Sequence, residues 1–181
     1  MVEGSRVPSY FEHAGMFLRV PVKSDAEPIQ QLRNDANTWI HLTDPRPLGP
    51  GDQKNWIESL SMRAGRFYFV VSTIETPFIG IVRMDELDTL NRSVRVGADI
   101  VPEFRGKGFG IRLYQLLKRY CFDFMNVHRV WLAVLETNGH AMRLYEKQGF
   151  KVEGRYRSAV YRDGKYLDYI LMSILESEYR A

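Results

Sequence analysis

Two kinds of hydrophobic spacing follow one another in the middle of the chain and predict a strand followed by a helix. In residues 93–100, apolar side chains occupy every second position, which is typical of a strand with two different faces. Residues 111–125 repeat apolar side chains at helical spacing instead. The glycine-rich segment 101–110 lies between the two patterns, so it is expected to form the turn that joins them.

The same patterns place the other elements. Strands are expected over residues 16–20, 67–73, 78–84, 130–135, 151–161 and 165–174, and helices over residues 27–34, 52–65 and 138–148. Asp163-Gly164 is a strong signal for a two-residue hairpin between the last two strands. The order predicts a single α/β (α+β) domain, with a mixed, mostly antiparallel sheet of about seven strands and about four flanking helices. Residues 1–14 are expected to be a loose leader, and residues 15–181 the domain.

Composition narrows the class of protein. A chain of 181 residues suits one domain with a sizeable core, and a net charge of +3 without charged blocks argues against nucleic acid as a partner. No long apolar run marks a signal peptide or a membrane span, so we expect a cytoplasmic protein with no membrane partner. Cys121 is the only cysteine, which excludes an internal disulfide and a cysteine zinc site, and no metal is expected.

The turn Arg105-Gly106-Lys107-Gly108-Phe109-Gly110 has the features of a phosphate-binding loop. The first N–H groups of a helix lack internal partners and carry partial positive charge, and glycine lets a backbone approach a ligand closely. The spacing is neither that of a P-loop nor the G-x-G-x-x-G of dinucleotide sites. The plain alternative is a strand-to-helix turn, for which one glycine would be enough.

A second pattern follows about thirty residues later. Asn138 is expected to cap a helix that carries Ala141 and Tyr145 on one face. The plain alternative is a capped amphipathic helix with Tyr145 half-buried in the core. Taken together, Arg-x-x-Gly-x-Gly and Asn-x-x-Ala-x-x-x-Tyr-Glu-x-x-Gly-Phe resemble the two signatures of the GNAT superfamily, the acetyl-CoA-dependent N-acetyltransferases.

The resemblance covers most of the chain. Residues 91–93, 127–130, 153–155 and 163–166 resemble the branch that holds spermidine, ribosomal-protein N-terminal and amino-sugar N-acetyltransferases. The resemblance implies that an acceptor amine attacks the acetyl thioester of acetyl-CoA directly. It also implies a set of cofactor-binding residues: Ile100, Val101, Arg105, Gly106, Lys107, Gly108, Phe109, Gly110, Ile111, Asn138, Ala141 and Tyr145.

The resemblance implies three roles for the residues of this set. The loop N–H groups would bind the cofactor diphosphate, with Ile111 opening the helix, and the side chains of Arg105 and Lys107 are additional candidates. A backbone N–H at Ile100 or Val101 would stabilise the oxyanion. Tyr145 stands where the family has the general acid for the leaving thiolate, and a phenol with a pKa of about 10 is protonated at neutral pH.

The general base is left open by the sequence. Many GNAT proteins have Glu two residues before the strand glycine, where this chain has Arg95. Asp99 lies on the same strand face and is one substitute, unless Arg95 neutralises it; His41 is the other, because its intrinsic pKa suits the task. A route through Cys121 is disfavoured, because a thiol on an apolar stripe has a raised pKa.

The acceptor is expected to be a primary amine of a small molecule such as an amino sugar or a polyamine. Trp39, His41 and Arg95 are the candidate substrate contacts. In relatives the pocket is built from the segments that correspond to residues 39–48 and 156–166.

The charged residues of the expected pocket, three arginines and few acids, bear on which acceptor is expected. Arg46, Arg95 and Arg157 favour an acceptor that carries phosphate or carboxylate, whereas a polyamine pocket should be lined with carboxylates. A protein N-terminus, such as that of a ribosomal protein, is an alternative acceptor. A GNAT fold that binds acyl-CoA without turnover is an alternative of another class, and self-association is left open.

Overall fold

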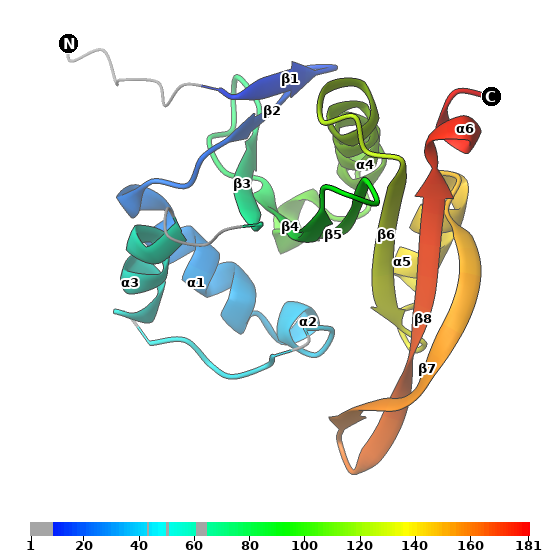
Figure 1. Ribbon diagram of the computed structural model, residues 1–181. Helices are drawn as coiled ribbons and strands as arrows, with labels where there is room; N and C mark the ends of the chain where they lie inside the picture. The colour runs from blue at the N-terminus through cyan, green and yellow to red at the C-terminus, as the bar shows by residue number, and fades with distance from the viewer. Residues whose placement is uncertain (1–8, 43, 50, 61–64) are drawn as a thin grey trace.

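The computed structural model describes residues 9–42, 44–49, 51–60 and 65–181 (Figure 1). A single eight-stranded sheet runs through the molecule in the order β1-β2-β3-β4-β5-β6-β8-β7. All neighbouring strands are antiparallel except β5 and β6, which are parallel. The mixed, mostly antiparallel sheet is therefore confirmed, with one strand more than the approximate seven expected.

The strand bounds follow the alternating patterns closely. The strands are β1 (Phe11–His13), β2 (Met16–Arg19), β3 (Phe67–Ser72), β4 (Gly80–Asp88), β5 (Ser93–Ile100), β6 (Arg129–Leu135), β7 (Lys151–Arg162) and β8 (Lys165–Leu175). In Figure 1 the far end of the hairpin formed by β7 and β8 extends beyond the helices.

Helices connect the strands on both sides of the sheet. The α-helices are α1 (Ala26–Asn34), α2 (Ala36–Trp39), α3 (Asp52–Ser59), α4 (Phe109–Arg119), α5 (Gly139–Lys147) and α6 (Glu176–Tyr179). The described residues thus contain six α-helices where about four were expected, and the additional ones, α2 and α6, have four residues each. A single helical turn is too short to show a period of 3.6 residues, so the sequence pattern could not reveal them.

The segment expected to be a loose leader contains a strand. In β1, Phe11 and His13 pair with Leu18 and Met16 of β2 across a turn with positive φ at Ala14 and Gly15. Three residues are too few for an alternating pattern to be recognised. Residues 1–8 lie outside the described residues, so a leader stays a prediction for that part of the chain.

Two helix boundaries differ from expectation. The helix expected from residue 111 begins at Phe109, and it ends in a π-helical turn, Tyr120–Phe124. The helix expected to end at Gly65 is α3, which ends at Ser59. Residues 61–64 lie outside the described part of the chain.

Side chains of β4 alternate between two hydrophobic clusters, one on each face of the sheet. Val82 and Met84 belong to a large cluster that includes Leu113 and other residues of α4. Ile81 belongs to a smaller cluster with residues of α1 and α3, among them Ile29. In Figure 1, α1, α2 and α3 are accordingly grouped together, apart from α4 and α5. Ile81 and the alternate positions up to Asp85 therefore face α1 and α3, whereas Leu87, after a shift in register, packs against the large cluster.

Candidate active site

A cavity opens between β5 and β6, the two parallel strands. They pair over only three positions, from Ser93↔Arg129 to Arg95↔Trp131, although β5 continues to Ile100 and β6 to Leu135. The widening space holds a cavity of about 350 Å³, which we name the strand cavity. Its lining includes eight of the predicted site residues in addition to His41: Asp99, Ile100, Arg105, Gly106, Gly110, Asn138, Ala141 and Tyr145.

The glycines of the loop have two different tasks. Gly106 and Gly108 have φ values of +72° and +82°, a left-handed conformation that favours glycine, and Gly108 directly precedes α4. Gly110 lies inside α4, where a Cβ atom would come within 3.0 Å of Leu144 Cδ2 on α5. The first two glycines shape the turn, and the third lets the start of α4 approach the side chain of Leu144 on α5.

Backbone donors at the start of α4 are available for an anion. The first helical hydrogen bond runs from Arg112 N to Gly108 O, at 3.3 Å. The N–H groups of the first turn, including those of Phe109, Gly110 and Ile111, therefore have no partner within the helix. The N–H of Arg105 differs from this set, because it already donates to Pro102 O, at 3.1 Å.

The side chain of Arg105 is held by protein groups. Its guanidinium donates to Ile100 O at 2.8 Å, to Asp35 Oδ1 at 3.2 Å and to Thr38 Oγ1 at 2.5 Å. These bonds tie the loop to the end of β5 and to the start of α2. This side chain therefore positions the loop, and a contact between it and the diphosphate stays a prediction.

The register of β4 and β5 distinguishes the two candidate oxyanion donors. Val101 N donates to Ile79 O at 3.0 Å, so this amide is used within the sheet. In an antiparallel ladder, opposite residues alternate between pairs that bond to each other and pairs that do not. The bond from Val101 to Ile79 makes Gly80 and Ile100 a pair of the second kind, so the Ile100 N–H points away from β4. It points toward the side where β6 has separated, and Ile100, unlike Val101, lines the strand cavity.

Tyr145 extends from α5 into the strand cavity. Its ring packs edge-to-face on Tyr114, with 5.1 Å between centroids, and lies 6.0 Å from the ring of Phe150. Burial raises the pKa of Tyr145 above its usual range, so the phenol is protonated at neutral pH. Asn138 caps the same helix as predicted, accepting a hydrogen bond from Ala141 N at 3.1 Å.

The single cysteine is remote from this chemistry. Cys121 is completely buried in the cluster behind α4. Burial raises the pKa of its thiol to about 12, so a reactive thiolate is absent at neutral pH.

A second, larger cavity of about 590 Å³ lies on the sheet face covered by α1 and α3, and we name it the helix-side cavity. It shares five lining residues with the strand cavity: His41, Arg83, Val96, Gly97 and Ala133. The two cavities therefore meet at these residues, which we call the junction. Two molecules entering from different sides can come into contact there.

Both acidic and basic side chains line the helix-side cavity. Its lining includes Asp44, Asp52, Asp85 and Glu86, together with Arg33, Arg46, Arg66, Arg83 and Arg95. Three of the acids have arginine partners: Asp44 with Arg46 (2.7 Å), Asp85 with Arg66 (3.7 Å) and Glu86 with Arg95 (3.1 Å). These acids come from three separate places in the chain, residues 44, 52 and 85–86, so local spacing could not predict that they line one cavity.

Arg95, one of the alternatives considered, does not pair with Asp99 in the structure. Asp99 forms an ion pair with Arg83 of β4, with 3.2 Å between Oδ2 and Nη2, whereas Arg95 lies over the ring of Trp131 with 5.4 Å to its centroid. A Cβ atom at Gly97 would lie 3.1 Å from Arg83 Nη2, so this glycine makes room for the guanidinium. The ion-pair partner of Asp99 is thus a residue of the neighbouring strand.

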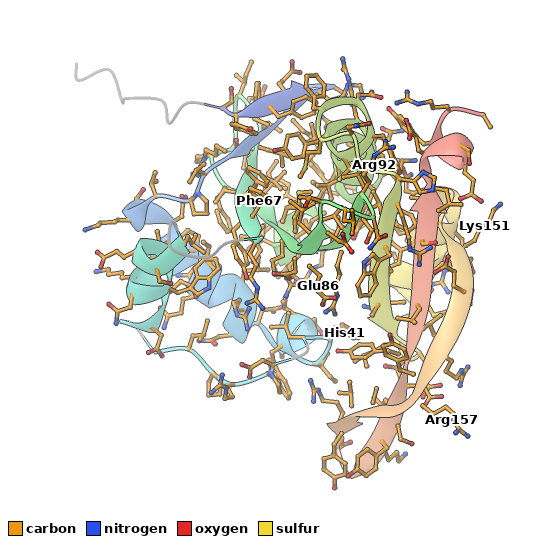
Figure 2. All side chains as sticks on the ribbon, viewed as in Figure 1. His41, Phe67, Glu86, Arg92, Lys151 and Arg157 are labelled. Carbon is orange, nitrogen blue, oxygen red and sulfur yellow. The ribbon has the colours of Figure 1, made fainter. Side chains whose placement is uncertain are left out.

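His41 lies where a proton acceptor could act. It borders both cavities, and Figure 2 shows His41 and Glu86 in the region between α2 and β6. Burial, and then the charge of Arg105, lowers the pKa of His41. Its imidazole is therefore neutral at pH 7 and able to take a proton.

Two residues expected at the acceptor site lie elsewhere. Trp39 is 39% exposed and is absent from the lining of both cavities, and so is Arg157. Figure 2 shows Arg157 on the projecting hairpin. Conversely, Arg33 and Arg83 line the helix-side cavity and were missed. The only available signal for Arg83 was its spacing of two residues from Asp85, which puts both on one face of a strand.

The described part of the chain lacks two other features. No group of three or more His, Cys, Asp or Glu residues is arranged there to hold a metal ion. No helix in those residues has both the length and the apolar character needed to cross a membrane.

Comparison with known proteins gives consistent matches. Residues 16–151 match the family model described as an acetyltransferase (GNAT) domain. A spermidine N(1)-acetyltransferase of Vibrio cholerae is 36% identical over 111 residues, 61% of this chain and 64% of that protein. One from Escherichia coli (strain K12) is 32% identical over 102 residues, 56% of this chain and 55% of that protein. The alignments thus span less than two thirds of these curated relatives.

A solved structure matches over almost the entire chain. It is that of the spermidine N-acetyltransferase from Vibrio cholerae in complex with CoA and spermine. The TM-score is 0.86 at 28% identity, and the match covers 93% of this chain and 100% of that one.

Proposed function

This chain belongs to the acetyltransferase (GNAT) domain family, and from that premise we propose that it transfers the acetyl group of acetyl-CoA to a primary amine of a small molecule. The observation that carries the proposal is the strand cavity, where the glycine loop and the helix of Tyr145 meet between two separated strands. The helix-side cavity reaches the same place from the other side, at the junction, and would admit the amine.

Acetyl-CoA fits the polar groups of the strand cavity, and it supplies an acyl group activated as a thioester. The N–H groups at the start of α4 would hold its diphosphate, because they lack helical partners and lie at the positive end of the helix. The Ile100 N–H would donate to the acyl oxygen as that oxygen gains negative charge. Tyr145 would give its proton to the departing sulfur.

The acceptor amine has to lose a proton before it attacks, because an alkyl ammonium with a pKa of about 10.4 is charged at pH 7. Asp99 and His41 are both proposed as the group that takes this proton. The carboxylate of Asp99 is already engaged in an ion pair with Arg83. His41 is neutral and borders both cavities, so the geometry favours His41, acting directly or through a water molecule.

A polyamine is the acceptor that the relatives support. The spermidine N(1)-acetyltransferases of Vibrio cholerae and Escherichia coli are similar to this chain, and a solved relative was crystallised with spermine. The acids of the helix-side cavity would suit such a cation, but three of the four are paired with arginine. Cytoplasmic location, self-association and action on a protein N-terminus stay predictions.

The proposal is tested by measuring thiol release from acetyl-CoA with a panel of amines. The panel contains spermidine, an aminoglycoside, a nucleotide-linked amino sugar and a peptide that begins with alanine. We expect thiol release with at least one small-molecule amine. Binding of acetyl-CoA without thiol release from any of them would favour the non-catalytic acyl-CoA-binding alternative, and release with the peptide alone would favour N-terminal acetylation.

A further inference from the structure

One arginine of the helix-side cavity differs from the other four. Arg46, Arg66, Arg83 and Arg95 each form an ion pair with a carboxylate. Arg33, on α1, forms none with the acids of the described residues. Its Nη2 donates instead to the backbone carbonyl of Asp44, at 3.2 Å.

A second guanidinium lies close enough to Arg33 to repel it. Burial, and then the positive charge of Arg83, lowers the pKa of Arg33. Like charges in a partly buried place destabilise each other unless an anion lies between them. Asp99 supplies one negative charge, which is engaged by Arg83 Nη2.

Each of the two guanidinium groups also has an Nε donor without a hydrogen-bond partner in the described residues. Arg33 Nε and Arg83 Nε are buried, and neither has a hydrogen-bond partner in the part of the chain that the structure describes. Buried donors of this kind are almost always satisfied by an acceptor. Both side chains line the helix-side cavity, and Arg83 also lines the strand cavity. An anion in the cavity that admits the amine can therefore reach both guanidinium groups, and a bond to the buried Nε donors requires these side chains to turn toward it.

We propose that Arg33 and Arg83 bind an anionic group of the acceptor, a carboxylate or a phosphate, so that the preferred substrate is an amine that also carries negative charge. The inference rests on the proposed function. Planar guanidinium groups suit both anions, because they donate two parallel hydrogen bonds. Since Arg83 lies at the junction, an anion held there leaves an amine on the same small molecule within reach of Gly97 and His41.

The arginines named from the sequence are not the ones that carry this site. Arg46 and Arg95 are paired with Asp44 and Glu86, and Arg157 lies outside both cavities. The paired acids also disfavour a polyamine, because each ammonium group would have to compete with an arginine for its carboxylate.

The test uses pairs of amines that differ by one anionic group. Putrescine is compared with ornithine, which adds a carboxylate, and ethanolamine with phosphoethanolamine, which adds a phosphate. Binding is measured by calorimetry on protein saturated with CoA, which lacks an acetyl group to transfer. We expect at least one anionic member to bind about tenfold more tightly than its partner or better, as a charge-assisted hydrogen bond would give. The pair with the larger ratio identifies the anion.

Variants locate the effect. In Arg33→Gln the preference for the anionic member should disappear, whereas Arg33→Lys, which keeps the charge, should retain part of it. Arg119→Gln removes an arginine on α4 that bonds to His13, outside both cavities, and should keep the full preference. Thermal unfolding of each variant confirms that it is folded.

The outcomes separate this inference from the proposed function. Equal or weaker binding of both anionic members, a preference that survives in Arg33→Gln, or no binding of any of the four compounds would overturn the inference. Turnover of other amines would then still support acetyl transfer. Preferential binding of an anionic member without thiol release from acetyl-CoA would uphold the anion site and count against acetyl transfer.

Discussion

Tyr145 combines the two properties that a proton donor to a leaving thiolate needs, since it reaches into the strand cavity and stays protonated there. Tyr145→Phe removes the hydroxyl and keeps the ring that packs on Tyr114. We expect turnover to fall about 10²–10⁴-fold, while the affinity for CoA stays the same. Steady-state thiol release and calorimetry measure the two quantities. Tyr161→Phe, on the projecting hairpin, is the matched control, and equal turnover in the two variants would remove Tyr145 from this role.

The raised pKa of Tyr145 also predicts the pH dependence of the reaction. The active form of this residue is the protonated one, which is lost only as pH rises through a pKa above the usual value of about 10. The acceptor amine becomes neutral as pH rises toward its own pKa. Between pH 7 and 9.5, kcat/KM for the amine should therefore rise without a decline. An alkaline decline centred below pH 9.5, on protein shown by circular dichroism to be folded, would contradict the assignment.

At the scale of single residues, local signals in the sequence were read correctly and pairings across strands were not. The cap at Asn138 and the positive φ at Gly106 and Gly108 depend on a few neighbouring residues, so the sequence alone predicts them. The partner of Asp99 depends on the register between β4 and β5. That register is a tertiary property, and for this reason Arg83 was overlooked in favour of Arg95.

At the scale of elements, the close approach of β4 to β5 directs the Ile100 N–H toward the strand cavity. A Cβ atom at Gly80 would lie 2.2 Å from Asp99 O, a backbone atom that cannot move aside alone. Gly80→Ala should lower the free energy of unfolding by about 1–3 kcal/mol, as overpacking does, and should reduce kcat more than it changes CoA affinity.

The control for this variant is Gly154→Ala on β7, where the structure places no heavy atom of the described residues within 4 Å of the added Cβ. Urea unfolding compares the two proteins. A loss of stability no greater than that of the control would mean that the strands are not in contact at Gly80 as described.

Helices of more than one turn and strands long enough to show a hydrophobic pattern were predicted well, whereas elements of three or four residues were not. Ser93–Ile100 was located by alternation, and the other strands from Phe67–Ser72 onward were located by apolar, aromatic and β-branched stretches and by the turn residues between them. β1, α2 and α6 have three or four residues, so they carry no measurable period. The π-helical turn, Tyr120–Phe124, continues the apolar pattern of α4, and only the hydrogen bonds distinguish it.

At the scale of the whole molecule, an ion pair joins the helices that cover the helix-side cavity to the sheet. Arg19 of β2 donates to both oxygens of Asp25, each at 2.7 Å, and also to Pro77 O at 2.9 Å. Both side chains are more than nine-tenths buried. Arg19→Ala leaves a buried carboxylate without its partner, and should lower the free energy of unfolding by about 3–5 kcal/mol.

A double variant checks the reason for that loss. If the cost comes from the unpaired carboxylate, Arg19→Ala with Asp25→Ala should cost clearly less than the sum of the two single variants. Additive losses in urea unfolding would show that the pair is not coupled. In either case the exposed Arg119→Gln variant provides the baseline for a surface arginine.

The shapes and linings of the two cavities could not be predicted from the sequence. The order of elements contains strand-to-helix crossovers at the glycine loop and at Asn138, but it does not show how far β5 and β6 separate between them. The charges of the helix-side cavity come from α1, the segment before α3, the start of α3, the residue before β3, and strands β4 and β5. Only the folded chain places Arg33 near Arg83, so the candidate anion site could not be predicted from local spacing.

A crystal structure of the complex with acetyl-CoA tests the central claim most directly. We predict a diphosphate bound by the N–H groups at the start of α4, a pantetheine arm between β5 and β6, and a thioester sulfur within hydrogen-bond reach of the Tyr145 hydroxyl. A diphosphate bound elsewhere on the protein, or a sulfur remote from Tyr145, would contradict the account.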